Sequence, residues 1–334
     1  MSNLLEMKNI SVQFSTSRGP LIALRNVSLS VAAGESLGIV GESGSGKSVT
    51  SYAIMGLLPP NGKVITGDIL FEGKSLLAMN EREKSKIRGS AISMIFQDPM
   101  SSLNPAFNVG YQLEETLLMH NETSRESARA KARELLGLVG IPDPEERLKA
   151  YPHQLSGGMS QRVMIAMAIA CKPKLLIADE PTTALDVTIQ AQILSLLRKI
   201  QKEQKMSMIL ISHDLALISE NTSRVAVMYA GEVAEVNQTE KLVQTPAHPY
   251  TEALLKSLPA YSVAQGLDRL PAIAGVVPDL VHRPNGCQLH PRCPYAQEKC
   301  KIETPALAGG LHQVSCFYPR VAKNYSEFLA EGKR

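Results

Sequence analysis

The chain has 334 residues, a length at which one compact core rarely suffices, so we expect two or three parts. A hydrophobic fraction of 44% with 20% charged residues is ordinary for a globular protein. The formal net charge of +3 and the absence of Trp give no reason to expect nucleic acid as a partner.

The start of the chain lacks the basic and then apolar pattern of a secretory signal. No apolar run approaches the roughly 20 residues that cross a bilayer. We therefore expect a protein that is cytosolic or held at a membrane by a partner.

In chain order, residues 4–33 alternate between apolar and polar around a break at 17–20, which predicts strands around a turn. The apolar run 36–40 is typical of a buried strand, and the proline-free segment 49–58 predicts a helix. Between them lies Gly41-Glu42-Ser43-Gly44-Ser45-Gly46-Lys47-Ser48, which matches the pattern G-x-x-x-x-G-K-[ST]. Backbone N–H groups at the start of a helix favour bound phosphate there, so Lys47 is expected to reach the β- and γ-phosphates and Ser48 to ligate Mg²⁺.

The rest of the chain predicts strands alternating with helices, which implies an α/β fold with a parallel sheet. The expected strands are 67–71, 94–96, 174–178, 208–211 and 225–228, and the expected helices are 124–139, 160–171 and 187–201. Ser124 is a plausible N-cap. From about residue 238 prolines recur and only 250–257 looks clearly helical, which indicates a loop-rich extension.

Two carboxylates, Asp179 and Glu180, end the apolar strand that starts near residue 174. Next to a phosphate loop, Asp179 can orient Mg²⁺ through water, and Glu180 can polarise the water that attacks the γ-phosphate. A strand that ends in two acids is common by itself, and only the phosphate loop makes this pair a strong indication.

A third motif, Leu155-Ser156-Gly157-Gly158-Met159, precedes the helix predicted from residue 160. With this motif the chain resembles the ATP-binding-cassette (ABC) ATPases, whose signature is L-S-G-G-Q. The fifth position departs from that signature, whereas the Ser and both Gly are kept. The resemblance covers residues 4–240 and implies a cassette core with an antiparallel β subdomain and a helical signature subdomain.

The resemblance also implies roles for single residues. Gln97 matches the Q-loop glutamine, Ala184-Leu185-Asp186 the D-loop and His213 the switch histidine, while Phe14 either stacks on adenine or belongs to the core. The implied catalytic residues are Glu180, His213, Gln97 and Lys47, and the implied Mg²⁺ contacts are Ser48, Gln97 and Asp179. The implied ATP contacts are Phe14, Gly41, Ser43, Gly44, Gly46, Lys47, Ser48, Val49, Ser156, Gly157, Gly158 and Asp186.

The family's geometry implies a dimer, because the signature of one chain closes over the nucleotide held by the phosphate loop of the other. The nucleotide-binding core is expected at 1–99 and 169–237, the signature subdomain at 100–168 and the extension at 238–334. A groove near Gln97 is expected to receive a coupling helix from a membrane subunit.

Four cysteines of the extension, Cys287, Cys293, Cys300 and Cys316, lie in a segment with little else to fold around. In a reducing compartment such thiols suggest a metal site or a cluster, and their spacing lacks the C-x₂₋₄-C knuckles that zinc favours. The segments 248–251 and 284–296 resemble the oligopeptide/dipeptide branch of the ABC importers. That branch implies a [4Fe-4S] cluster on these cysteines, and zinc stays open as an alternative.

The resemblance implies an ATPase subunit of a di- or oligopeptide importer at the cytoplasmic face of the bacterial inner membrane. Its partners would be a second ATPase subunit, expected to be a paralogue, two transmembrane permeases and, indirectly, an extracytoplasmic peptide-binding protein. Another cargo, namely nickel, glutathione or an antimicrobial peptide, stays open because the ATPase does not touch the cargo. Two other classes of function are considered. One is a soluble ABC ATPase of DNA repair or translation, and the other is a non-catalytic regulatory cassette.

Overall fold

The computed structural model describes residues 3–120, 123–183, 185–269, 271–320 and 324–326. The backbone divides into two compact units. The first unit contains 32–35 and 78–210, and the second unit contains 3–31, 36–77 and the chain from 211 onward. Among the described residues, no helix is long and apolar enough to cross a membrane.

The second unit begins with a four-stranded antiparallel sheet in the order β2-β1-β4-β5. Its strands are β1 (Asn3–Thr16), β2 (Gly19–Ala32), β4 (Gly62–Phe71) and β5 (Lys74–Ser75). Ile10, Leu24 and Ile69 are fully buried, whereas alternate positions of these strands are exposed. The predicted strands around a turn are therefore confirmed, and the polar–apolar alternation has the expected cause of one buried face.

A second run of strands in the same unit supports the phosphate-loop motif. It consists of β3 (Ser36–Val40), β9 (Arg224–Tyr229), β10 (Glu232–Gln238) and β11 (Gln313–Val314), in the order β11-β10-β9-β3. β3 and β9 are parallel, and β10 is antiparallel to both β9 and β11. The helices α1 (Lys47–Met55) and α9 (Leu215–Asn221) belong to this unit.

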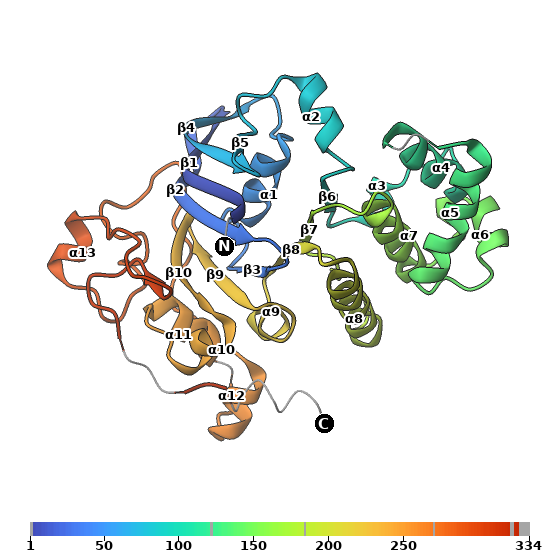
Figure 1. The fold of residues 1–334 in the computed structure, drawn as a ribbon. Coiled ribbons are helices and arrows are strands. Elements are labelled where there is room, and N and C mark those ends of the chain that lie inside the picture. The colour runs from blue at the N-terminus through green and yellow to red at the C-terminus, as the bar shows by residue number, and fades with distance from the viewer. Residues whose placement is uncertain (1–2, 121–122, 184, 270, 321–323, 327–334) are drawn as a thin grey trace. The chain divides into compact units, whose positions relative to one another are not determined.

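The first unit combines parallel strands with a group of helices. Its strands are β6 (Ile92–Ile95), β7 (Leu175–Asp179) and the start of β8 (Ser207–Ser212), with β6 and β7 parallel. Its helices are α2 (Glu81–Ile87), α3 (Pro99–Ser102), α4 (Val109–His120), α5 (Arg125–Leu138), α6 (Pro144–Lys149), the 3₁₀ helix η1 (Pro152–Gln154), α7 (Gly157–Ile169) and α8 (Val187–Gln204). Helices α4 to α7 gather into one group (Figure 1), with Leu113, Ala132, Leu136 and Val163 buried among them. Ser124 caps α5 as predicted by accepting a hydrogen bond from the Ser127 N–H.

The extension is more helical than the sequence predicts. Its helices are α10 (Thr239–Gln244), α11 (Pro249–Lys256), α12 (Pro259–Ala264) and α13 (Glu298–Ile302). Two of them begin at a proline, because the first helical position needs no N–H partner and proline already has a helical φ. Helix α11 confirms the helix predicted at 250–257, whereas the expectation of no other clear helix was wrong. The described part from residue 265 to 297 contains neither helix nor strand.

Candidate nucleotide site

The phosphate-loop motif stands on a rigid base in the second unit. Leu37, Ile39 and Val40 of β3 are at most 1% exposed, so the strand that leads into the loop is fixed by packing. Helix α1 begins immediately after the loop with Gly46 as its N-cap, which makes no side-chain cap hydrogen bond. The loop therefore connects a buried strand to an uncapped helix start, which is the geometry that an anion site requires.

The loop glycines stand where side chains would not fit. A Cβ on Gly41 would lie 2.2 Å from the Met228 carbonyl oxygen, and one on Gly46 would lie 2.6 Å from a Leu24 methyl group. Gly44 and Gly46 also have φ values of 78° and 100°, which side chains disfavour. The Oγ atom of Ser45 is buried and has no hydrogen-bond partner in the described part of the chain. A narrow backbone cradle with such a donor fits the phosphates of a nucleotide.

The Lys47 side chain is 6% exposed, and its ammonium lies at the entry of the loop. Its Nζ donates to the carbonyl oxygens of Gly41 at 2.8 Å and Glu42 at 3.1 Å. Ser48 and Val49, in the first turn of α1, are half-buried, whereas Ser43 and Gly44 at the tip of the loop are exposed. The Lys47 ammonium and the first turn of α1 thus both lie at the phosphate loop.

Behind the loop, the turn after β9 joins it to β2 and to the extension. The Gly231 N–H donates to the Ser45 carbonyl oxygen, and the Arg25 N–H donates to the Gly231 carbonyl oxygen, both at 2.9 Å. Because β3 and β9 are parallel, the loop that follows one strand and the turn that follows the other emerge at the same edge.

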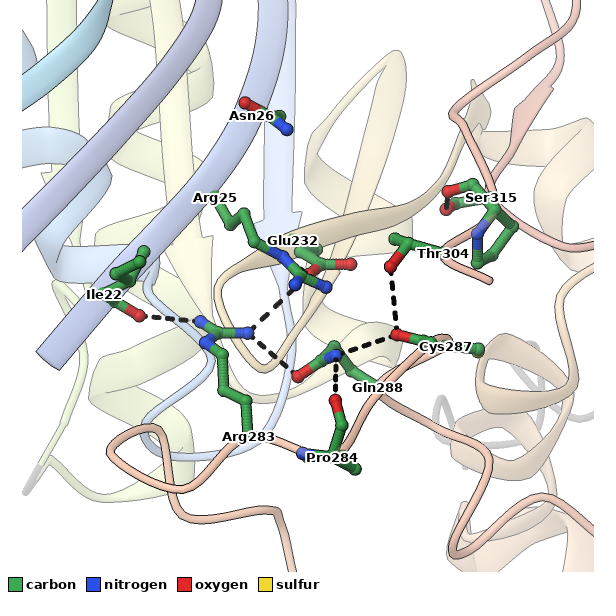
Figure 2. Close-up of polar contacts among 12 residues, drawn as sticks. Ile22, Arg25, Asn26, Glu232, Arg283, Pro284, Cys287, Gln288, Thr304 and Ser315 are labelled. Atoms are coloured by element: carbon green, nitrogen blue, oxygen red, sulfur yellow. Dashed lines mark hydrogen bonds and ion pairs between the residues drawn. The ribbon is translucent and has the colours of Figure 1, made fainter. Parts of the chain in front are cut away.

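An ion-pair network secures this turn (Figure 2). The Arg283 guanidinium donates to the Ile22 carbonyl oxygen at 2.7 Å and to Gln288 Oε1 at 3.0 Å, and it lies 3.6 Å from Glu232 Oε1. Arg25 pairs with the same carboxylate. Burial lowers the pKa of Arg283 to about 10 and raises the pKa of Glu232. Arg283 remains charged at neutral pH, and its contacts fix the extension against β2 and β10.

The predicted carboxylates lie in the first unit. Asp179 ends β7 with 1% exposure, and Glu180 follows with a positive φ of 46°. Glu180 Oε2 accepts hydrogen bonds from Gln97 Nε2 at 3.3 Å and from Thr183 Oγ1 at 3.0 Å. Since β6 and β7 are parallel, Gln97 and Glu180 emerge at the same edge. The structure therefore brings together two residues that are 83 positions apart in the sequence.

The helix at the signature motif, α7, begins earlier in the sequence than predicted. Ser156 is the N-cap of α7, and its hydroxyl accepts a hydrogen bond from the Met159 N–H at 3.4 Å. Gly157 and Gly158 form the first turn of the helix, and a Cβ on Gly158 would lie 3.2 Å from Ile189 of α8. The prediction that the helix starts at residue 160 was wrong, because glycine is tolerated where the helical N–H groups face outward.

The remaining predicted residues are spread over both units. Asp186 is exposed and caps α8 by accepting a hydrogen bond from the Ile189 N–H at 2.9 Å, while Ala184 lies outside the described residues. His213 is exposed and follows β8 in the second unit. Phe14, also in the second unit, is half-buried and faces Gly62 across the β1–β4 pair.

Sequence reasoning missed three side chains at these sites. Thr183 holds the Glu180 carboxylate, and Tyr250 and Arg292 of the extension contact Glu42 of the phosphate loop. Thr183 lies close enough in sequence to have been found, as a hydroxyl three residues beyond a strand-end acid. The other two lie more than 200 positions from Glu42, and no local signal marks them.

The prediction of an iron–sulfur cluster was wrong. Among the residues that the structure describes, which include all four cysteines of the extension, no group of three or more His, Cys, Asp or Glu side chains could hold a metal ion. The four thiols line a cavity of about 20 Å³ with Leu289, Tyr295, Phe317 and Tyr318. Burial raises the pKa of Cys287 to about 11 and also raises the pKa of Cys293 and of Cys316. These cysteines therefore belong to a small apolar core.

Two protein families match the chain, and each covers a different part. The family described as ABC transporter matches residues 24–183. The family described as the C-terminal region of oligopeptide/dipeptide transporters matches residues 234–300. The second match falls on the extension, so the extension is a family feature and not an unrelated addition.

Solved structures match the cassette part of the chain. A dimeric post-hydrolysis state of the ATP-binding cassette MJ0796 bound to ADP and phosphate has a TM-score of 0.64 at 30% identity, covering 70% of this chain and 98% of that one. The cbiO1 protein of Clostridium perfringens, part of an ABC transporter complex, has a TM-score of 0.62 at 28% identity, covering 72% and 91%. The predicted α/β cassette fold is confirmed.

Curated relatives match nearly the whole chain. The dipeptide transport ATP-binding protein DppD of Haemophilus influenzae is 54% identical over 95% of this chain and 96% of its own length. DppD of Escherichia coli is 53% identical over 95% and 97%, and the oligopeptide transport ATP-binding protein OppD of Bacillus subtilis is 52% identical over 89% and 83%. This chain therefore belongs to the ABC transporter family, among the ATP-binding proteins of its oligopeptide/dipeptide branch.

Proposed function

We propose that this chain hydrolyses ATP to ADP and phosphate and thereby energises a membrane importer of di- or oligopeptides. The observation that carries the proposal is the similarity over 95% of the chain to dipeptide transport ATP-binding proteins, extension included. An ATPase subunit does not touch the cargo, so the cargo class is inferred from the branch of the family and not from a pocket.

The chemistry is assigned to the residues that the sequence predicts. Membership of the ABC family implies ATP with Mg²⁺ as the ligand, and the cradle of the phosphate loop fits the phosphates. Lys47 would neutralise charge on the phosphates, and Ser48, Gln97 and Asp179 are the residues that we expect to contact Mg²⁺. Glu180 holds the attacking water through the carboxylate that Gln97 and Thr183 position. His213 is assigned to the γ-phosphate.

The remaining sequence predictions enter the proposal as they stand. Ser156, Gly157, Gly158 and Asp186 act on the nucleotide of a partner subunit, so the working unit is a dimer of ATPases. We expect a paralogue as that partner, two transmembrane permeases as the dock, and the cytoplasmic face of the inner membrane as the location. The proposed nucleotide-binding core is 1–99 with 169–237. The proposed signature subdomain is 100–168, and the extension is 238–334.

The test of the chemistry is a Glu180→Gln variant, because the amide keeps the shape of the side chain and removes the base. We expect ATP binding within about threefold of the unchanged protein and a turnover at least about 100-fold lower, as for the loss of general-base catalysis. Glu203→Gln, an exposed carboxylate of the neighbouring helix α8 that pairs with Lys199, is the matched control and should retain full turnover. Hydrolysis by Glu180→Gln at half the normal rate or more would contradict the assignment.

The test of the cargo uses cells that carry the complete importer. Uptake of a labelled dipeptide should stop in the Glu180→Gln strain and continue in the Glu203→Gln strain. If uptake of nickel or glutathione stops instead and dipeptide uptake is unchanged, the importer carries another cargo. The ATPase assignment would then still hold.

A further inference from the structure

Glu42, the second residue of the phosphate-loop motif, is held by two side chains of the C-terminal extension. Its N–H donates to the Tyr250 hydroxyl at 2.9 Å. Its carboxylate oxygens lie 3.3 and 3.2 Å from Nη1 of Arg292. All three residues belong to the second unit. We call Glu42, Tyr250 and Arg292 the Glu42 clamp.

The Arg292 side chain of the clamp is held by several hydrogen bonds in addition to its pair with Glu42. The Arg292 side chain is 4% exposed, and its Nε and Nη2 donate to the carbonyl oxygens of Ala274 at 2.9 Å and Ile273 at 3.2 Å. Its Nη1 also donates to the Tyr229 hydroxyl at 3.2 Å, and its guanidinium lies 5.7 Å from the centre of that ring. With this many partners, the guanidinium cannot follow Glu42 if the loop moves, so it holds the carboxylate in one place.

The Tyr250 end is equally rigid. Tyr250 is fully buried in the first turn of α11, and its ring lies 4.7 Å from that of Tyr229. The Tyr250 N–H donates to Nδ1 of His248, the N-cap of the same helix, at 3.1 Å. Burial raises the pKa of Tyr250, so the hydroxyl stays neutral and can accept the Glu42 N–H.

The Glu42 clamp fixes the part of the loop that holds the Lys47 ammonium. The Lys47 ammonium is bonded to the carbonyl oxygens of Gly41 and Glu42, which are the stretch of loop that the clamp fixes. The clamp also controls charge, because a carboxylate within the phosphate loop repels a triphosphate unless a cation neutralises it. Arg292 is the cation that pairs with Glu42.

We propose that Tyr250 and Arg292 are positioning residues for the phosphate loop, through which the C-terminal extension sets the affinity for ATP. The inference rests on the proposed function, in that this loop is taken to bind ATP. Neither residue touches the nucleotide. Tyr250 fixes the backbone that carries the Lys47 ammonium, and Arg292 cancels the charge of Glu42.

The experiment measures binding of the fluorescent analogue mant-ATP with Mg²⁺ to the full-length chain. Arg292→Met should raise the Kd about tenfold, and Tyr250→Phe, which removes only the hydroxyl, about threefold. Glu42→Gln should lower the Kd below that of the unchanged protein, because the arginine then adds uncompensated positive charge beside the phosphates. The double variant Glu42→Gln with Arg292→Met should recover most of the loss caused by Arg292→Met.

The control is Arg18→Met, which removes another tie between the same extension and the rest of the unit. Arg18 pairs with Asp279 at an exposed position and is not part of the Glu42 clamp, so the Kd should stay within twofold. A purely structural role of the extension predicts the same sign for all variants and no recovery in the double variant, and either result would overturn the proposal. Should Arg292→Met fail to fold, as judged by circular dichroism, the opposite signs of Tyr250→Phe and Glu42→Gln still decide the question.

Failure of the proposed function looks different from failure of this inference. If the unchanged protein neither binds mant-ATP nor hydrolyses ATP, the proposed function is wrong. If it does both and Arg292→Met and Tyr250→Phe bind mant-ATP with an unchanged Kd, only the positioning role is wrong.

Discussion

Gly231, in the turn between β9 and β10, lies next to the phosphate loop, β2 and the extension. Its φ is 79°, and a Cβ would lie 2.2 Å from the Ala23 carbonyl oxygen and 2.9 Å from Nη2 of Arg283. The carbonyl belongs to the backbone of β2 and cannot rotate away as a side chain can. A Gly231→Ala substitution must therefore displace either β2 or the turn.

The cost can be worked out from these contacts. A side chain at positive φ costs about 1–2 kcal/mol. Displacing the turn also weakens the hydrogen bonds from Arg25 N–H to Gly231 and from Gly231 N–H to Ser45, each worth about 1 kcal/mol. We expect a loss of about 3–4 kcal/mol in the free energy of unfolding, which lowers the urea midpoint by about 1 M for an m-value of about 3 kcal/mol/M.

Gly73 provides a matched control in the same unit. It has nearly the same φ, 76°, in the β4–β5 turn, and a Cβ there would meet no atom within 4 Å. Gly73→Ala should therefore cost only the conformational part, about 1–2 kcal/mol. The urea midpoints of both variants and of the unchanged protein, followed by circular dichroism, decide the matter. Equal midpoints for the two variants would refute the reasoning, because the backbone contact at Gly231 would then carry no energy.

Three further outcomes are expected. Thr183→Ala should lower the turnover several-fold at unchanged Kd for mant-ATP, because Glu180 loses the hydroxyl that positions its carboxylate; equal turnover would argue against that role. Ser156→Ala and Ser124→Ala each remove a helix N-cap and should lose about 1 kcal/mol of stability, yet only Ser156→Ala should lose ATP hydrolysis, measured as phosphate release by the assembled transporter. Burial lowers the pKa of His248 to about 4, whereas an unfolded histidine takes up a proton below about 6.5, so folding stability should fall by up to about 3 kcal/mol as the pH drops from 6.5 to 4. His248→Asn, which can still cap α11, should lack this part of the slope in urea midpoints measured against pH.

The elements that the sequence predicts well are those with a local cause. The strand-loop-helix order around Lys47 follows from an apolar run, a glycine-rich motif and a proline-free segment, and the structure has it as β3, the loop and α1. The cap at Ser124 follows in the same way from a hydroxyl in front of a helical stretch. Each of these signals is local in the sequence, so no knowledge of packing is needed.

The helix boundaries failed where one residue type has two roles. Pro249 starts α11 one residue before the helix predicted at 250–257, and Pro259, in a segment that the sequence predicts to be loop, starts α12. Gly157 and Gly158 were likewise placed before the helix, although glycine is acceptable in a first turn whose N–H groups have no partner within the helix.

The iron–sulfur prediction failed for a different reason. Four cysteines in one segment do gather in space, as the sequence suggests, but gathering does not make a metal site. Their thiols share a small cavity with aromatic and aliphatic side chains. Composition cannot distinguish a ligand cage from an apolar core, since cysteine serves in both.

The support of the phosphate loop could not have been predicted, and it changes the view of what determines affinity. The backbone of the loop is held from outside by Tyr250 at the Glu42 N–H and by Gly231 at the Ser45 carbonyl oxygen. These supports come from a helix of the extension and from the turn after β9. An anion site binds strongly when its donors are oriented before the anion arrives, because the cost of ordering them is then not taken from the binding energy. Substitutions in the extension should therefore change ATP affinity without touching the nucleotide, and the motif alone does not fix the strength of the site.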